Sequence, residues 1–177
     1  MNREEAAFWL GQLIPAELEF GPDSAVADLG EGQRVALTVG FSDVDTGLVA
    51  VDGGDEVRSE LITVARAEKE QLADVLAAAA RMLADAEGIL PAQPGTMLPG
   101  LAEKAGLRDV SVSHGLFVPP YLWGGETPRF TEEGRLTVLL QLVMLTDAEY
   151  AYAVEEGPGG LQQALGEAGA DLLDWRR

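Results

Sequence analysis

Four stretches of the chain have the hydrophobic pattern of β-strands. On one face of residues 34–41 every second residue is apolar, which predicts a half-buried strand: Val35, Leu37, Val39 and Phe41. Residues 57–65 and 110–118 predict two more strands. Residues 136–145 are apolar at nearly every position. We therefore expect this last stretch to be the central strand of a sheet, covered on both faces.

Two segments in the first half have helical signals. Asn2 followed by Glu5 approximates a capping box, so a helix is predicted at the N-terminus, and Pro15 ends it. The strongest helical periodicity in the chain spans residues 67–87. Gly88 follows it at the position where a C-cap glycine is expected.

A third helix is predicted near the end of the chain. Thr146 and Glu149 have the spacing of a second capping box, and the helix that they begin is expected to run to Gly157. A shorter helical piece is expected at residues 161–166. Between the helices, residues 88–109 are rich in proline and glycine and predict a long irregular excursion.

The order of these elements predicts an α+β fold. Strands do not alternate regularly with helices and no internal repeat is present, which favours a mixed, largely antiparallel sheet flanked by helices. The length of 177 residues is typical of one domain, so we expect residues 1–177 to form a single core.

Composition narrows the function further. The chain has no cysteine and one histidine, which excludes disulfides and cysteine-based zinc sites, and we expect no metal and no cofactor. The net charge of −18 would repel nucleic acid and attract a basic protein partner. No apolar run approaches the ~20 residues that a membrane span needs, and no signal peptide is evident. We therefore expect a soluble, cytoplasmic protein, of undetermined oligomeric state.

Catalytic and metal-binding patterns are weak. His114 is the only imidazole, and the sequence does not place a nucleophile and an orienting carboxylate beside it, so no catalytic residue is assigned. Asp43 and Asp45 begin a stretch that resembles a calcium loop, joined by Asp52 and Asp55. The stretch lacks the remaining ligands and the central glycine, and ordinary turn chemistry accounts for it better.

The segment 119–125 is the strongest candidate for contact with another molecule. Its two prolines fix an extended path, and Tyr121, Leu122 and Trp123 are bulky side chains in a predicted loop. Tyrosine and tryptophan are enriched at binding hot spots, so these three residues are predicted to bind a protein partner, supported by the surface acids Asp43 and Asp45. The alternative for Trp123 is that it folds back onto the core.

Longer motifs resemble a known family. The run from His114 to Trp123 (HGLFVPPYLW) and the run from Leu139 to Tyr150 (LLQLVMLTDAEY) are similar to the bacterial branch of the Suppressor of fused-like family. The stretches 58–65 and 94–100 fit the family in the same order, and the resemblance covers residues 30–165. It implies a mixed α/β fold and protein–protein contact rather than catalysis.

The resemblance also suggests a more specific role. Bacterial relatives are often thought to act as immunity proteins that neutralise toxins, and the acidity of this chain would suit a basic toxin. The leading hypothesis is therefore a non-enzymatic protein-binding module. The alternative is a small-ligand-binding protein or small hydrolase whose pocket lies near His114 and residues 88–109.

Overall fold

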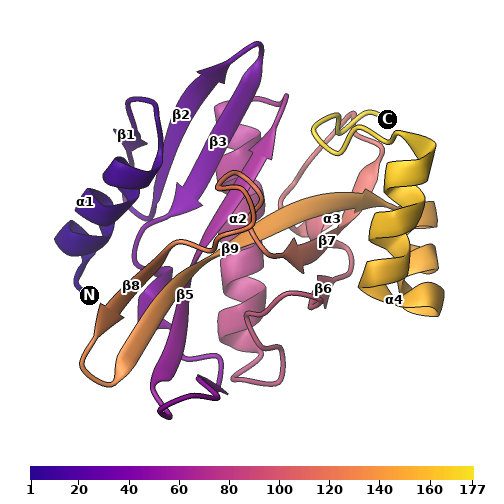
Figure 1. The fold of residues 1–177 in the computed structure, drawn as a ribbon. Helices are drawn as coiled ribbons and strands as arrows, with labels where there is room; N and C mark the ends of the chain where they lie inside the picture. Colours follow the sequence, from indigo (N-terminus) through magenta and orange to yellow (C-terminus); the bar gives the residue numbers. More distant parts are fainter.

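Strand β9 (Arg135–Thr146) runs through the middle of a nine-stranded sheet in the computed structural model, which describes residues 1–177 (Figure 1). The main path of the sheet is β1-β2-β3-β5-β9-β7-β6, while β4 pairs with β5 and β8 pairs with β9. The other strands are β1 (Glu19–Phe20), β2 (Ser24–Gly30), β3 (Gln33–Thr38), β4 (Leu48–Val49), β5 (Glu56–Ala65), β6 (Met97–Leu98), β7 (Val112–Val118) and β8 (Arg129–Glu132).

The sheet is mixed and largely antiparallel, as the sequence predicts. Only β5 and β9 pair in parallel, with Glu56 opposite Arg135 and Ile62 opposite Gln141. Every other pair of neighbouring strands is antiparallel. The helices are α1 (Arg3–Leu13), α2 (Lys69–Asp85), α3 (Leu101–Lys104) and α4 (Asp147–Ala168), with a short 3-10 turn at Phe41–Asp43.

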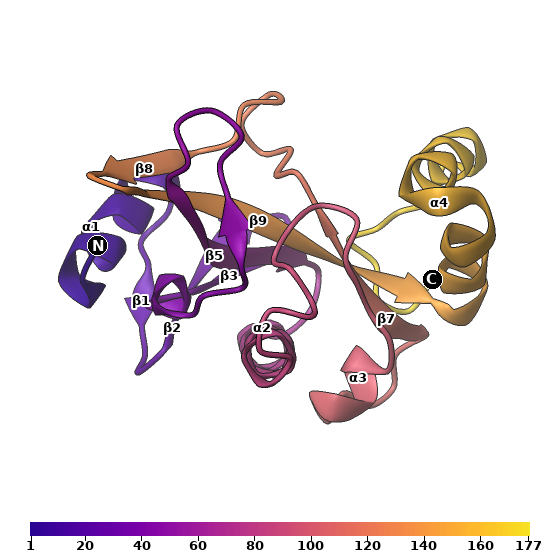
Figure 2. The same ribbon diagram turned by 90° about the horizontal axis from the view of Figure 1, so that it is seen from below.

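The helices cover the two faces of the sheet unequally. Figure 2 shows α2 and α3 on one side of the sheet and α4 beside the far end of β9. Side chains alternate along β9, so Leu140, Leu142 and Met144 join the core beneath α2. On the opposite face Leu139 packs in the core that contains α1 residues, and Val143 packs in a smaller cluster with α4 residues. Helices α1 and α4 thus cover opposite ends of that face.

Three of the four predicted strands lie within one or two residues of their expected bounds, and the fourth needs correction. The strand predicted at 34–41 ends at Thr38, and the chain then turns at Gly40, whose φ is 103°. It is not half-buried, because consecutive residues from Val35 to Thr38 are all buried. Core clusters on both faces enclose it: Val35 and Leu37 lie with α1 residues, and Ala36 lies with α2 residues. The sequence analysis did not predict β1, β2, β4, β6 and β8.

Both predicted capping boxes are present. The Asn2 side chain accepts a hydrogen bond from the Glu5 backbone and Glu5 returns one, and Thr146 and Glu149 do the same at the start of α4. Helix α4 continues beyond its expected end at Gly157 as a second segment. Gly157 has φ 79° and ψ 165°, a conformation outside the helical region that suits glycine, so the two segments meet at a kink. None of the helices combines the length and the hydrophobicity that a transmembrane span requires.

Glu60 is a fully buried acid in the centre of β5. Its carboxylate accepts hydrogen bonds from the Thr38 hydroxyl (2.6 Å) and from the backbone N–H groups of Gly40, Phe41 and Ser42 (2.9, 3.2 and 3.2 Å). Burial raises the pKa of Glu60, and the hydrogen bonds from Thr38, Ser42 and Gly40 oppose that shift. These four bonds fix the turn after β3 against β5.

Replacing Glu60 with Gln is expected to lower the free energy of unfolding by about 1–3 kcal/mol, because an amide has one acceptor oxygen and its NH2 group would face buried donors. Urea denaturation measures the effect. The matched control is Glu133→Gln in the exposed β8–β9 turn, which should change stability by no more than about 0.5 kcal/mol. Equal stability of the two variants would contradict a clamping role for Glu60.

Candidate functional site

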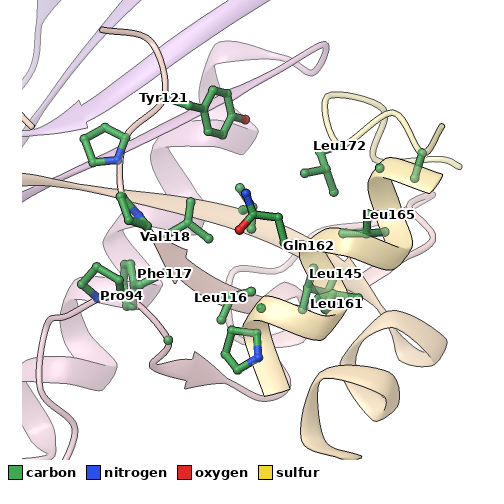
Figure 3. A pocket seen from close by; sticks show the side chains of 18 of the residues that line it. Pro94, Leu116, Phe117, Val118, Tyr121, Leu145, Leu161, Gln162, Leu165 and Leu172 are labelled. Atoms are coloured by element: carbon green, nitrogen blue, oxygen red, sulfur yellow. The ribbon is translucent and has the colours of Figure 1, made fainter. Parts of the chain in front are cut away.

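An apolar cavity of about 970 Å³ lies between the sheet and the second segment of α4 (Figure 3). Leu116 from β7 and Val143 and Leu145 from β9 line it from the sheet. Leu161 and Leu165 line it from α4. The cavity lies on the face of the sheet that α1 and α4 share, at the end that α4 covers, and none of its lining residues is charged.

The loop 119–125 forms another wall of this cavity. Pro119, Pro120 and Tyr121 line it, and Figure 3 shows Tyr121 apart from the α4 leucines. Tyr121 is 48% exposed and Leu122 is 42% exposed, so two large side chains that are adjacent in the chain are exposed beside the apolar cavity. Trp123 is half-buried and packs against the core cluster that contains α1 residues. The three predicted contact residues therefore divide into two exposed side chains and one that contacts the core.

Gln141 holds the loop from beneath. It is fully buried within β9, and its Oε1 accepts a hydrogen bond from the Tyr121 backbone N–H at 3.2 Å. Its amide nitrogen has no hydrogen-bond acceptor. Burial raises the pKa of the Tyr121 phenol, and an interaction with the Gln141 side chain offsets part of the shift. The sequence analysis did not single out Gln141, although a polar residue in a strand that is buried on both faces indicates a specific hydrogen-bond partner.

The α4 wall of the cavity is fixed by the end of the chain. Arg177 donates from Nε and Nη2 to the two carboxylate oxygens of Glu149 (2.9 and 2.6 Å) and from Nη2 to the Met144 carbonyl (2.7 Å). Residues 169–172, which join α4 to this ion pair, contribute Gly169, Ala170 and Leu172 to the cavity. Sequence analysis did not assign any of these residues to a site.

His114 does not line the cavity. Its Nδ1 accepts a hydrogen bond from the Gly100 N–H at 2.9 Å, its Nε2 lies 2.7 Å from Asp147 Oδ1, and its ring stacks on Tyr150 with centroids 4.2 Å apart. Because Nδ1 is an acceptor, the Nε2–H tautomer donates to Asp147. Both ring nitrogens are engaged, and neither contacts a hydroxyl group. This arrangement joins the β6–α3 turn to the start of α4.

Asp43 and Asp45 are exposed but do not line the apolar cavity. Asp45 accepts the Gly47 N–H at 2.8 Å, which is ordinary turn chemistry, and its carboxylate lies 3.5 Å from the Arg58 guanidinium. The four aspartates of the weak calcium-like pattern do not converge, and no group of three or more His, Asp or Glu side chains is arranged to hold a metal ion.

A family model described as Suppressor of fused protein (SUFU) matches residues 24–177. A Suppressor of fused homolog from Neisseria gonorrhoeae has a similar structure, with a TM-score of 0.71 and 16% identity over 99% of this chain and 94% of that chain. A chain of the Sufu–Fu complex has a TM-score of 0.66 and 13% identity, covering 99% of this chain and 91% of that chain. Drosophila Suppressor of Fused has a TM-score of 0.53 and 15% identity, covering 96% of this chain and 44% of that chain. No curated protein matches the sequence.

The Arg177–Glu149 pair predicts a pH-dependent contribution to stability. Burial by itself would raise the pKa of Glu149, but hydrogen bonds from Arg177 and Thr146 outweigh it, so its pKa lies below the ordinary value of 4.5. A lowered carboxylate pKa contributes stability that is present above pH 4.5 and is lost as the pH falls through the folded-state value.

Replacing Arg177 with Ala should therefore lower the free energy of unfolding at pH 7 by about 1–3 kcal/mol, the value of hydrogen bonds to a charged group. Below pH 4 the free energy of unfolding of the variant should approach that of the parent protein. Urea denaturation at a series of pH values measures both. Arg176→Ala is the matched control, because Arg176 is exposed and next in the chain. A difference that stays constant with pH would exclude the proposed role of Glu149.

Proposed function

The chain belongs to the Suppressor of fused family, and from this premise we propose that it is a non-enzymatic domain that binds another protein through the loop 119–125 and the adjoining cavity. The observation that carries the proposal is the exposure of Tyr121 and Leu122 at the edge of an apolar hollow. Exposed large apolar groups that are grouped in this way mark interaction sites in folded proteins.

The local geometry supports contact by these residues. The Tyr121 backbone is hydrogen-bonded to Gln141 and Trp123 packs on the core, so the backbone that carries the two exposed side chains is anchored at both ends. A binding surface that is already ordered loses less conformational entropy when the partner docks. Tyrosine also provides a large contact area and a polar hydroxyl group.

We propose that the partner is a basic protein. The net charge of −18 would raise the rate of encounter with such a partner, and Asp43 and Asp45 are exposed acids that add to this field. A basic toxin neutralised by this chain is the most specific form of the proposal. A similar structure is that of the Sufu–Fu complex, which is consistent with a family of protein-binding domains.

The cavity also supports a second candidate function. Its volume and apolar lining are within the range of small-molecule sites, and Pro94 and Gly95 from the 88–109 segment belong to its wall. His114 lies outside the cavity and has both ring nitrogens engaged, so the geometry supports a small-ligand-binding protein better than a hydrolase.

The double substitution Tyr121→Ala with Leu122→Ala should weaken partner binding at least tenfold and leave the melting temperature nearly unchanged. The reason is that both side chains are exposed, whereas Trp123, which packs on the core, is retained. Affinity is measured by calorimetry with the partner isolated at low salt on the immobilised protein. The Phe8→Ala variant is the control, because Phe8 is an exposed aromatic residue on α1 (70%). Unchanged affinity of the double variant would exclude this surface.

A further inference from the structure

The interior of the cavity and its rim differ in charge. The lining is uncharged, and its polar side chains are those of Tyr121 and Gln162. Every charged residue that directly follows or precedes a wall residue in the chain is an acid, and we call these acids the rim. Three such acids exist and all are exposed: Glu126, Glu167 and Asp171. Asp171 pairs with Arg66, whereas Glu126 and Glu167 form no ion pair.

The contrast between an uncharged interior and an acidic rim favours one class of ligand for the cavity over others. A second copy of the chain, with its own net charge of −18, would be repelled by the rim. A small neutral molecule would fit the interior but would gain nothing from the carboxylates outside it. A protein segment with one large apolar side chain flanked by lysine or arginine would satisfy both parts of the site, because the uncharged interior excludes the cations and the rim attracts them.

We propose that the cavity binds a basic peptide segment of the partner, which inserts a large apolar side chain between α4 and β7 while its flanking cations contact the rim acids. This inference rests on the proposed function and adds the chemistry of the segment that is recognised. Gln162 lies on the same helix stripe as Gly159 and Gly166, and it is the α4 group that can hydrogen-bond to the backbone of the inserted segment.

The glycines of this stripe allow a test that leaves the fold intact. Gly159 and Gly166 line the cavity, have no positive φ, and have no atom within 4 Å of an added Cβ. Leucine at either position would project from α4 into the cavity and would favour the helix more than glycine does. Gly11 in α1 is the matched control, because it is also a helical glycine with free space and lies outside the cavity.

The experiment selects peptides from a randomised 12-residue library on the parent protein and measures their affinities by fluorescence anisotropy. We expect the selected peptides to share a large apolar residue flanked by Lys or Arg. Their affinity should fall at least tenfold for Gly159→Leu and Gly166→Leu, remain unchanged for Gly11→Leu, and weaken as salt is raised.

Three results would overturn the inference: no enriched peptide, enriched peptides without flanking cations, or equal affinity for the cavity-filled variants. Stabilisation of the protein by neutral apolar molecules alone, seen by thermal shift and abolished by Gly166→Leu, would assign the cavity to a small ligand instead. A partner that loses affinity on Tyr121→Ala with Leu122→Ala but not on Gly166→Leu would retain the proposed function and refute the inserted side chain.

Discussion

The burial of β9 on both faces is the constraint that determines where every other element lies. Residues 139–145 are all buried, so each face of the strand needs its own cover. Helix α2 covers one face, while α1 and α4 cover opposite ends of the other. The two helices leave a space between them, and there the loop 119–125 crosses the strand above Gln141. The cavity is the part of this space that side chains do not fill.

An apolar cavity of this kind favours apolar occupants. Moving an apolar group from water onto apolar side chains is favourable, so an apolar group that enters the cavity gains free energy. The kink at Gly157 contributes to this geometry, because the helical segment after it supplies the leucines of the outer wall. The acids of the rim then act at longer range, where they affect the rate and specificity of binding more than its strength.

The sequence predicted the class and centre of the fold better than it predicted the site. Local patterns predicted the position of β9 and the capping boxes of α1 and α4, since apolar runs and cap spacings are local properties of the sequence. Tyr121 was predicted to contact a partner, but its exposure and the cavity beside it could not be predicted, because both depend on the β9 register and on Arg177 packing beside α4. Burial of β3 on both faces was missed for the same reason: its cover comes from helices distant in sequence.

The parallel pairing of β5 with β9 has a consequence for how the protein folds. Ile62 lies opposite Gln141, so the partners are separated by 141 minus 62, or 79, positions along the chain. Closing a loop of this length costs conformational entropy before any contact compensates for it, and folds dominated by such pairings form slowly. The sheet wall and the α4 wall of the cavity both depend on the placement of β9, so we expect the cavity to form late in folding. Until β9 pairs with β5, the nascent chain exposes its apolar strands.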